Sequence, residues 1–356
     1  MRVEAILREA WRNVSSGTVR AVALSLVLTA LGLTAVAAEF SFVSGVEREA
    51  QEFRDSGGSI ITVLAPGRVD GARCDGLASV RGVRAAGALA VLHDERITAV
   101  ALPGAPLAHG RASAGFPAVL RAETDGGPGL ILSGDAERLL DATVGDGLRT
   151  TDGTTRVSGV YEYPRDGRRD GYGYMALETD GSSTAFDECW VDVWPQDAAM
   201  RSLILTTLRP GTGTDDEQPE VAPLNLTHGL GFEGYTRYRD RITRWAGVGI
   251  GVLTAIISFV ALRARRVEIA SALHDRASRI DLWAVTFTET LVWAAPPVVF
   301  CTVVSATVFA ARGELVVGVV LGARVAMLIA AGAVLGVATA LLATRERDLF
   351  LYAKDR

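Results

Sequence analysis

Four apolar segments constrain the fold of this chain more than any other feature of its sequence. They cover residues 21–38, 246–262, 282–311 and 315–344, and a long polar region separates the first from the second. A helix needs roughly 17–25 apolar residues to cross the hydrocarbon core of a bilayer, and each segment has this length or nearly so. We therefore expect a polytopic α-helical membrane protein with four transmembrane helices in a 1+3 order.

The basic residues predict how these spans are oriented. Arginines precede the first span and fill the loop 263–281. The tail 345–356 holds Arg345 and three further basic residues, whereas the loop 312–314 has only Arg312. Short cytoplasmic loops carry an excess of Lys and Arg. We expect both termini and the loop 263–281 in the cytoplasm, and the polar region outside.

Composition excludes several kinds of activity. Residues 39–240 hold 31 Asp and Glu against 19 Arg, a net charge of −12, which argues against a nucleic-acid partner. Lys354 is the single lysine and does not follow a glycine, so the chain has no phosphate-binding G-x-x-x-x-G-K-[ST] loop. The four histidines are isolated and no G-x-S-x-G motif occurs. We expect no catalytic residues, no metal and no cofactor on this chain.

The predicted organisation follows the chain in order. We expect an amphipathic cytoplasmic helix at 1–18, spans at 19–38, 245–262, 282–311 and 315–344, an extracytoplasmic domain at 39–244, a cytoplasmic loop at 263–281, an outer loop at 312–314 and a cytoplasmic tail at 345–356. Small residues at 34–38 resemble a signal-peptidase site, but the apolar run of the first span is long, which favours a retained anchor. The first helix lies along the membrane surface or simply begins the first span.

The polar region has the pattern of an α+β domain carried on two helical stalks, at 46–53 and 235–244. Short β-like runs are separated by Gly, Asp and Pro, and 197–208 has helical periodicity. The predicted strands are 59–64, 83–92, 97–102, 129–132, 157–163, 174–178 and 190–194, and a polar linker is predicted at 211–220.

Cys74 and Cys189 both fall in the extracytoplasmic region, where disulfides persist. They form either a disulfide or two separate buried thiols. Cys301 lies in a span, where we expect it only to pack.

Two ionisable residues lie inside apolar segments, where charges are costly and are often functional. At 1.5 Å per residue, Glu289 lies about 33 Å from the outer end of the third span and Arg324 about 14 Å from that of the fourth. A separation of roughly 20 Å in depth argues against a salt bridge between them. Glu289 is expected near the cytoplasmic interface, and Arg324 either snorkels outward or faces the protein interior. Gly247/Gly251, Gly318/Gly322 and Gly332/Gly336 are small-xxx-small pairs that permit close helix packing.

The order of spans and three local motifs resemble the permease subunits of the MacB/FtsX/LolC-type ABC transporters. Residues 9–13 (EAWRN) with 19–20 (VR) are similar to the first helix of that family. Residues 144–146 (VGD) with 157–160 (VSGV) are similar to a strand pair of its periplasmic core domain. Residues 265–270 (RRVEIA) with 277–282 (ASRIDL) are similar to its cytoplasmic loop, and Glu289 falls where the family often has a Glu.

The resemblance implies that 263–281 forms a coupling helix that lies in a groove of a separate cytoplasmic ATPase. Ala272 and Leu273 would form the docking face, and Glu268, Asp275, Arg276 and Ser278 would add polar contacts. The alternative is an ordinary basic turn. Arg276 replaces a family glycine, so the backbone turn at this position is expected to differ.

Three functions follow from these observations. The favoured one is a mechanotransmission permease of a bacterial plasma membrane that binds an ABC ATPase dimer and a second permease chain, identical or related, and moves a peptide, lipid or lipoprotein. Membrane lipid and an extracytoplasmic protein or peptide are further expected partners, and ATP is bound only by the ATPase. The alternative is an FtsX-like scaffold that activates a cell-wall hydrolase without transport. A membrane-anchored enzyme lacks any catalytic set.

Overall fold

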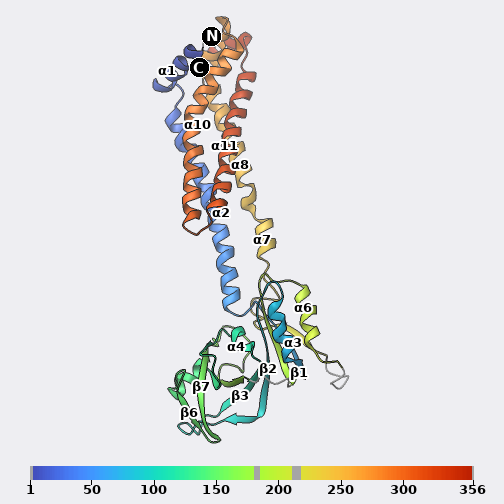
Figure 1. The fold of residues 1–356 in the computed structure, drawn as a ribbon. Helices are drawn as coiled ribbons and strands as arrows, with labels where there is room; N and C mark the ends of the chain where they lie inside the picture. Colours follow the sequence, from blue (N-terminus) through green and yellow to red (C-terminus); the bar gives the residue numbers. More distant parts are fainter. Residues whose placement is uncertain (1–2, 180–184, 211–217, 355–356) are drawn as a thin grey trace. The chain divides into compact units, whose positions relative to one another are not determined.

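The structure, a computed structural model, describes residues 3–179, 185–210 and 218–354. It divides into two compact units. One is helical and combines Met1–Val46 with Tyr235–Arg356, and the other is Glu47–Gly234, which contains a mixed sheet (Figure 1). The second unit is therefore shorter at both ends than the domain predicted at 39–244, because the helical stalks extend each span into the polar region.

Within the residues that the structure describes, four helices are long and apolar enough to cross a membrane. The helices of the helical unit are α1 (Val3–Ser15), α2 (Ala21–Asp55), α7 (Gly234–Asp240), α8 (Ala246–Arg263), α9 (Arg266–His274), α10 (Arg279–Ala310), α11 (Leu315–Ala343) and α12 (Leu349–Lys354), with 3-10 turns at Ile242–Trp245 and Glu346–Asp348. α2 runs on past the predicted end of its span at residue 38 to Asp55, so span and stalk are one helix. Pro296 and Pro297 lie inside α10, which continues through them.

Close backbone approach holds α8, α10 and α11 side by side (Figure 1). A Cβ at Gly332 or Gly336 would collide with the backbone carbonyls of α8 at Gly251 and Ala255. Gly318 and Gly322 approach α10 in the same way. Lipid tails are as apolar as the side chains, so small residues that allow tight contact supply much of the association between membrane helices.

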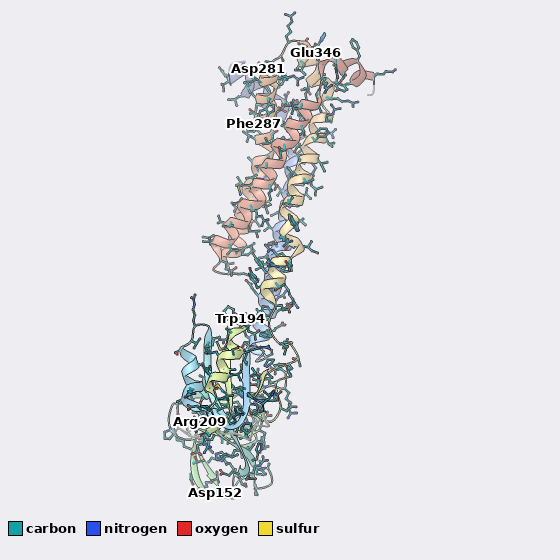
Figure 2. The ribbon with its side chains drawn as sticks, turned by 90° about the vertical axis from the view of Figure 1, so that its right-hand side faces the viewer. Asp152, Trp194, Arg209, Asp281, Phe287 and Glu346 are labelled. Atoms are coloured by element: carbon teal, nitrogen blue, oxygen red, sulfur yellow. A yellow bond between two sulfur atoms is a disulfide. The ribbon has the colours of Figure 1, made fainter. Side chains whose placement is uncertain are left out.

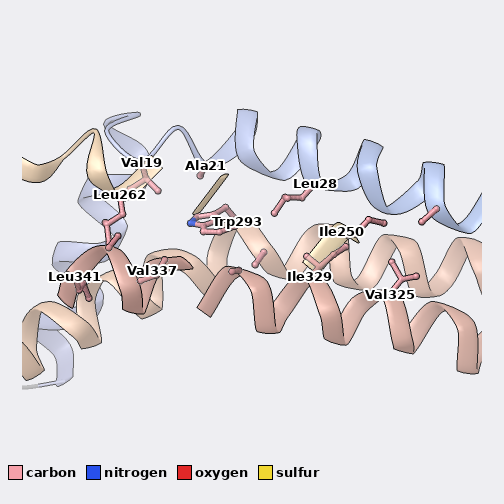
Figure 3. Close-up of a cluster of buried hydrophobic side chains, with 14 of the residues drawn as sticks. Val19, Ala21, Leu28, Ile250, Leu262, Trp293, Val325, Ile329, Val337 and Leu341 are labelled. Carbon is pink, nitrogen blue, oxygen red and sulfur yellow. The ribbon is translucent and has the colours of Figure 1, made fainter. Parts of the chain in front are cut away.

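A buried apolar cluster joins α2 to these three helices. Trp293 of α10 is 3% exposed and lies beside Leu28, Ile329 and Val337 (Figure 3). The Ser25 hydroxyl of α2 donates a hydrogen bond of 2.6 Å to the Trp293 carbonyl. Because this hydroxyl finds its acceptor on another helix, it fixes the register of α2 on α10.

Within the described residues, the second unit has a ten-stranded sheet in the order β10-β1-β9-β2-β3-β8-β5-β7-β4, with β6 paired to β7. β3 pairs in parallel with β8 and β5 with β7, and the other pairs are antiparallel. The strands are β1 (Ile60–Asp70), β2 (Val83–Ile97), β3 (Leu107–Ala112), β4 (Glu123–Thr124), β5 (Leu130–Ser133), β6 (Gly147–Thr150), β7 (Gly153–Tyr161), β8 (Met175–Thr179), β9 (Ala185–Val193) and β10 (Glu220–Pro223).

Helices cover both faces of this sheet. α3 (Gly71–Gly76) and α6 (Ala199–Ile204), each followed by a 3-10 turn (Leu77–Ser79 and Leu205–Thr207), pack on one face through a cluster that includes Val63 and Val191. α4 (Phe116–Val119) packs on the other face against Trp190. α5 (Gly134–Leu140) covers the far end of the sheet with a smaller cluster.

Several predicted boundaries were wrong. β2 continues to Ile97 instead of ending at residue 92, and its register with β3 shifts between Leu92 and Arg96, as at a β-bulge. The rest of the strand predicted at 97–102 forms no strand: Ala99 makes an isolated bridge with Thr150, and a turn follows. β3, β4, β6 and β10 were not predicted. The helix predicted at 197–208 is α6 followed by a 3-10 turn. The stalk predicted at 235–244 is α7 with an extended break at Arg241 (ψ 137°). Most of the predicted linker, 211–217, lies outside the described residues.

Candidate functional site

The loop predicted at 263–281 contains α9, a helix of nine residues between α8 and α10. Its end is a Schellman motif, in which the Arg276 amide donates to the Leu273 carbonyl (3.2 Å) and the Ala277 amide to the Ala272 carbonyl (3.0 Å). Arg276 has a φ of +61°. The backbone therefore adopts the left-handed conformation that a glycine favours, which corrects the expectation that Arg276 would give a different turn.

Glu289 of α10 is the centre of a polar junction, defined here as Asn13, Arg265, Glu268 and Glu289. The Glu289 side chain is 3% exposed and lies 2.7 Å from the guanidinium of Arg265, which precedes α9. The other carboxylate oxygen accepts a hydrogen bond of 2.7 Å from the side-chain amide of Asn13 in α1. Three helices that are separate in the sequence therefore meet at one buried carboxylate.

Arg265 completes the polar junction by binding a second carboxylate. Its Nε and Nη2 atoms donate to the two oxygens of Glu268 at 3.0 and 2.7 Å, in a fork geometry. The Arg265 side chain is 11% exposed and that of Glu268 is 48% exposed. The guanidinium thus links a buried carboxylate on α10 to an accessible one on α9.

The energetics make the polar junction rigid. A charge taken out of water is costly unless it is paired and hydrogen-bonded, and removal of one partner leaves the other charge uncompensated. A cavity of about 20 Å³ borders Arg265, Glu289 and Trp293, which is room for about one water molecule. The space around the pair is therefore too small for either side chain to be solvated separately.

Contacts to the C-terminal segment hold the other side of α9. His274 Nδ1 lies 3.1 Å from a carboxylate oxygen of Glu346. The guanidinium groups of Arg263 and Arg266 lie 5.4 and 5.3 Å from the ring centre of Tyr352 in α12, within the range of cation–π attraction. Glu346 lies at the same end of the helical unit as Asp281 at the start of α10 (Figure 2). α9 is thus attached to α1, α10 and the C-terminal segment.

The predicted docking residues divide by their exposure. Glu268, Asp275 and Arg276 are exposed, and Ala272 and Leu273 are half-buried. Ser278 caps α10: its hydroxyl accepts from the Asp281 amide at 3.0 Å and donates to the Asp281 carboxylate at 2.7 Å. Ser278 therefore has a structural partner on its own helix. The buried side chains of α9 are Ile269 and Ala270.

Glu289 and Arg324 do not contact each other, and Arg324 donates to the Arg244 carbonyl at 3.1 Å. Sequence reasoning did not find Asn13 and Arg265 as partners of Glu289. The sequence places Arg265 in the basic loop and in the motif 265–270, and the signal for its pairing is a carboxylate in an apolar segment with a basic residue on the adjoining loop. A second pair was also missed: Glu39 of α2 lies 2.7 Å from Arg241.

Cys74 of α3 and Cys189 of β9 form a disulfide with a Cα–Cα distance of 5.9 Å. Cys301 is buried and free, and it packs against Gly32 of α2. Within residues 3–179, 185–210 and 218–354, no group of three or more His, Cys, Asp and Glu side chains could hold a metal ion.

Neither a protein-family model nor a curated protein sequence matches the chain. Two solved structures are similar to parts of it. The periplasmic region of MacB from Actinobacillus actinomycetemcomitans is 10% identical over 42% of this chain and 83% of that one, with a TM-score of 0.31. A domain of a protein described as a permease from Porphyromonas gingivalis is 15% identical over 48% of this chain and 92% of that one, with a TM-score of 0.34.

Proposed function

We propose that this chain is the permease subunit of an ABC transporter of the MacB/FtsX/LolC type, in which α9 docks on a separate cytoplasmic ATPase. The chain would lie in the cytoplasmic membrane of a bacterium and pair with a second permease chain. Both termini and α9 would be cytoplasmic, and Glu47–Gly234 would be the extracytoplasmic domain. Its cargo would be a peptide, a lipid or a lipoprotein.

The polar junction is the observation that carries this proposal. An exposed helix that transmits force must itself be held rigidly, because a mobile loop would absorb the movement of its partner. α9 meets this requirement: Arg265 connects it to Glu289 of α10, and Glu289 connects to Asn13 of α1. Packed helices move as rigid bodies, so a displacement of α9 would be carried to α1 and α10.

Two observations support the orientation. The basic loops before α2 and between α8 and α10 favour the cytoplasmic side under the positive-inside rule. The disulfide between Cys74 and Cys189 is of the kind that persists in an oxidising compartment and is rare in the cytosol. The two observations therefore agree on opposite sides for α9 and for Glu47–Gly234.

α2 would carry the movement outward. It contacts α10 through the hydrogen bond from Ser25 to Trp293 and runs without a break to Asp55. At that end Arg121 pairs with the Asp55 carboxylate at 3.0 Å, and Arg168 donates to the Asp55 carbonyl at 2.5 Å. The second stalk, which contains α7, is interrupted by extended backbone at Arg241. It would therefore bend under a force that the continuous helix α2 would transmit.

ATP-driven closure of the ATPase would thus favour one of two arrangements of α9, α10 and α2. A ligand shifts such an equilibrium only by its differential affinity for the two states. The ATPase would supply that difference by gripping α9 in its closed state, and this chain would supply only the rigid connections. Its own residues would perform no chemistry.

The test is purification of the tagged full-length chain from membranes of its source, followed by ATPase assays. An ABC ATPase should co-purify, and its activity should be stimulated by the wild-type chain. Glu289→Gln removes the charge that holds Arg265 and should lower the stimulation about tenfold, a coupling free energy of about 1.4 kcal/mol.

Glu39→Gln is the matched control, since Glu39 is also a buried carboxylate on a long apolar helix with one arginine partner. It should leave the stimulation within about twofold of the wild type, which is below the roughly fivefold or larger effects typical of coupled sites. Equal losses in both variants would show that any buried charge matters and would remove the special role of the polar junction. Purification without any ATPase would contradict the proposal as a whole.

A further inference from the structure

The far end of the helical unit has a pocket that the proposed function does not use. It has a volume of about 270 Å³ and lies between α2, α7, α10 and α11. Its apolar wall includes Phe309, Val316, Val317 and Val320, and its polar lining is Glu39, Tyr238, Arg241 and Arg324. The three valines are 75%, 51% and 62% exposed in the chain, so the wall is open along the start of α11.

The polar groups of this pocket leave one positive charge without a carboxylate. Arg241 is neutralised by Glu39, whose Oε1 atom lies 2.7 Å from both Nε and Nη2. Arg324 has no Asp or Glu oxygen within 4.0 Å among the described residues, and its hydrogen bond goes to the Arg244 carbonyl. Glu39, Arg241 and Arg324 together therefore have a net charge of +1.

Arg324 is also placed at an unusual depth. It lies nine residues after Leu315, the first residue of α11, or about 14 Å along the axis. Its side chain is turned toward the end of the unit where Arg244 precedes α8, as expected for an arginine that snorkels to the headgroup region. A fixed cation at the boundary between apolar wall and headgroups is complementary to a lipid phosphate.

We propose that this pocket binds an anionic glycerophospholipid, with its phosphate on Arg324 and one acyl chain along Val316, Val317 and Val320. The charge of +1 favours a lipid with net negative charge over a zwitterionic one, since Glu39, the carboxylate of the lining, is buried and already paired with Arg241. The apolar wall favours a lipid over a free anion, because an anion would leave the valines unfilled. Guanidinium groups are well suited to phosphate through paired N–H donors.

The pocket differs in chemistry from the polar junction at the other end of the same helices. The polar junction has two carboxylates and one arginine, a net charge of −1, so it offers no site for an anion. The lipid site does not depend on the ATPase: a chain that binds no ATPase can still bind lipid, and a chain without the lipid site can still couple. The two proposals therefore fail independently.

The experiment measures lipid retained by the purified full-length chain after incubation with vesicles of phosphatidylglycerol or of phosphatidylcholine, by native mass spectrometry. Phosphatidylglycerol should be retained at least about tenfold more strongly. Arg324→Gln should abolish this preference, and Arg324→Lys should keep part of it because the charge remains. Arg312→Gln, which removes another exposed arginine at this end of the unit, should change nothing.

A second variant tests the apolar wall without altering charge. Val317→Trp fills the pocket and should displace the lipid while Arg324 stays in place. Equal retention of both lipids, or full preference in Arg324→Gln, would overturn the proposal. Displacement of the lipid by millimolar inorganic phosphate would identify a simple anion site instead. Crosslinking of a second chain across Val317 in place of lipid would show that the pocket is a contact between copies.

Discussion

The two units of this protein each bury a carboxylate with an arginine, and they use the pair differently. In the sheet unit, Glu188 of β9 accepts hydrogen bonds from Tyr172 and Trp190, both at 2.7 Å, and pairs with Arg169. In the helical unit, Glu289 pairs with Arg265 and accepts from Asn13. The two sites have nearly the same chemistry. They differ in which parts of the chain supply the residues that pair with the carboxylate.

The partners of Glu188 form a closed aromatic cage. The Arg169 guanidinium lies 5.4 and 5.7 Å from the ring centres of Tyr172 and Trp190. Tyr161 donates to the Tyr172 carbonyl and Tyr163 to the Arg169 carbonyl, both at 2.6 Å. Burial raises the pKa of all three tyrosines well above the usual range. The cage therefore fixes the segment between β7 and β8 onto the sheet.

The partners of Glu289 come from two other segments of the chain, Asn13 from α1 and Arg265 from the residue before α9. Glu268, the second partner of Arg265, remains accessible to solvent. A buried charge pair is weak evidence for stability in itself. The comparison teaches that such a pair closes a core in the sheet unit, where its partners come from β9 and the segment packed on it, and links separate helices in the helical unit.

The largest expected effect comes from removal of each carboxylate in turn. Glu188→Ala should lower the free energy of unfolding of the sheet unit by about 3–5 kcal/mol, because Arg169 loses its carboxylate inside a closed cage. Glu289→Ala should cost the helical unit only about 1–2 kcal/mol, because Arg265 keeps its pair with Glu268. Hydrogen exchange of β9 and α10 amides in the full-length chain measures both values.

The comparison would break if the two variants had equal effects on their own units. Glu188→Gln and Glu289→Gln serve as controls, since each keeps the shape and one carbonyl acceptor. A loss in Glu289→Ala as large as that in Glu188→Ala would mean that Glu289 stabilises the fold, and the connecting role would be unsupported.

The sequence predicted the helical unit better than the sheet unit for a physical reason. Long apolar runs determine membrane helices almost alone, so the four spans were placed within a few residues over most of their length. The strands depend on their neighbours. β3 has the sequence LAHGRA, with no β-branched residue, and Gly110 leaves room there for the side chains of Met175 and Leu177.

The candidate site was predicted as a segment but not as a set of contacts. The motif at 265–270 located α9, and the apolar background singled out Glu289. The pairing of Arg265 with Glu289 spans 24 positions and follows no helical or strand periodicity, so it requires knowledge of how α9 folds back. The left-handed backbone at Arg276 was not predicted either, because an arginine rarely adopts it.

A smaller effect is expected from the disulfide, which distinguishes the sheet unit further. Cys74 lies beside Asp75, and Cys189 follows Glu188, so the bridge ties α3 to the strand that carries the cage. Replacing both cysteines by alanine should destabilise the sheet unit by about 2–4 kcal/mol and leave the exchange of α10 amides unchanged. Non-reducing gels of the wild-type chain should show a faster band that shifts on reduction. An unchanged band would mean that the two thiols are separate.

The smallest expected effect concerns a third carboxylate, Asp75, which forms no ion pair with an arginine among the described residues and relies on neutral donors. The Ser113 hydroxyl donates to it at 2.5 Å and the Gly115 amide at 3.2 Å. Burial raises its pKa, and these two hydrogen bonds only partly oppose the rise. The folded state therefore prefers the protonated form more strongly than the unfolded chain does.

The sign of the pH dependence follows from this preference. Because the folded pKa is raised, Asp75 stabilises the fold most below the unfolded value of 3.8, and this contribution is lost as the pH rises through the folded pKa. The Asp75→Asn variant has no titrating group at this position. The free energy of unfolding of the wild type minus that of the variant should therefore fall as the pH rises through the folded pKa of Asp75, and it should stay constant at higher pH. Urea unfolding of the sheet unit in the full-length chain, followed by Trp fluorescence from about pH 3 to 7, measures the difference. A difference that rises with pH would mean that the hydrogen bonds from Ser113 and Gly115 outweigh burial, and Asp75 would then behave like a carboxylate with an arginine partner.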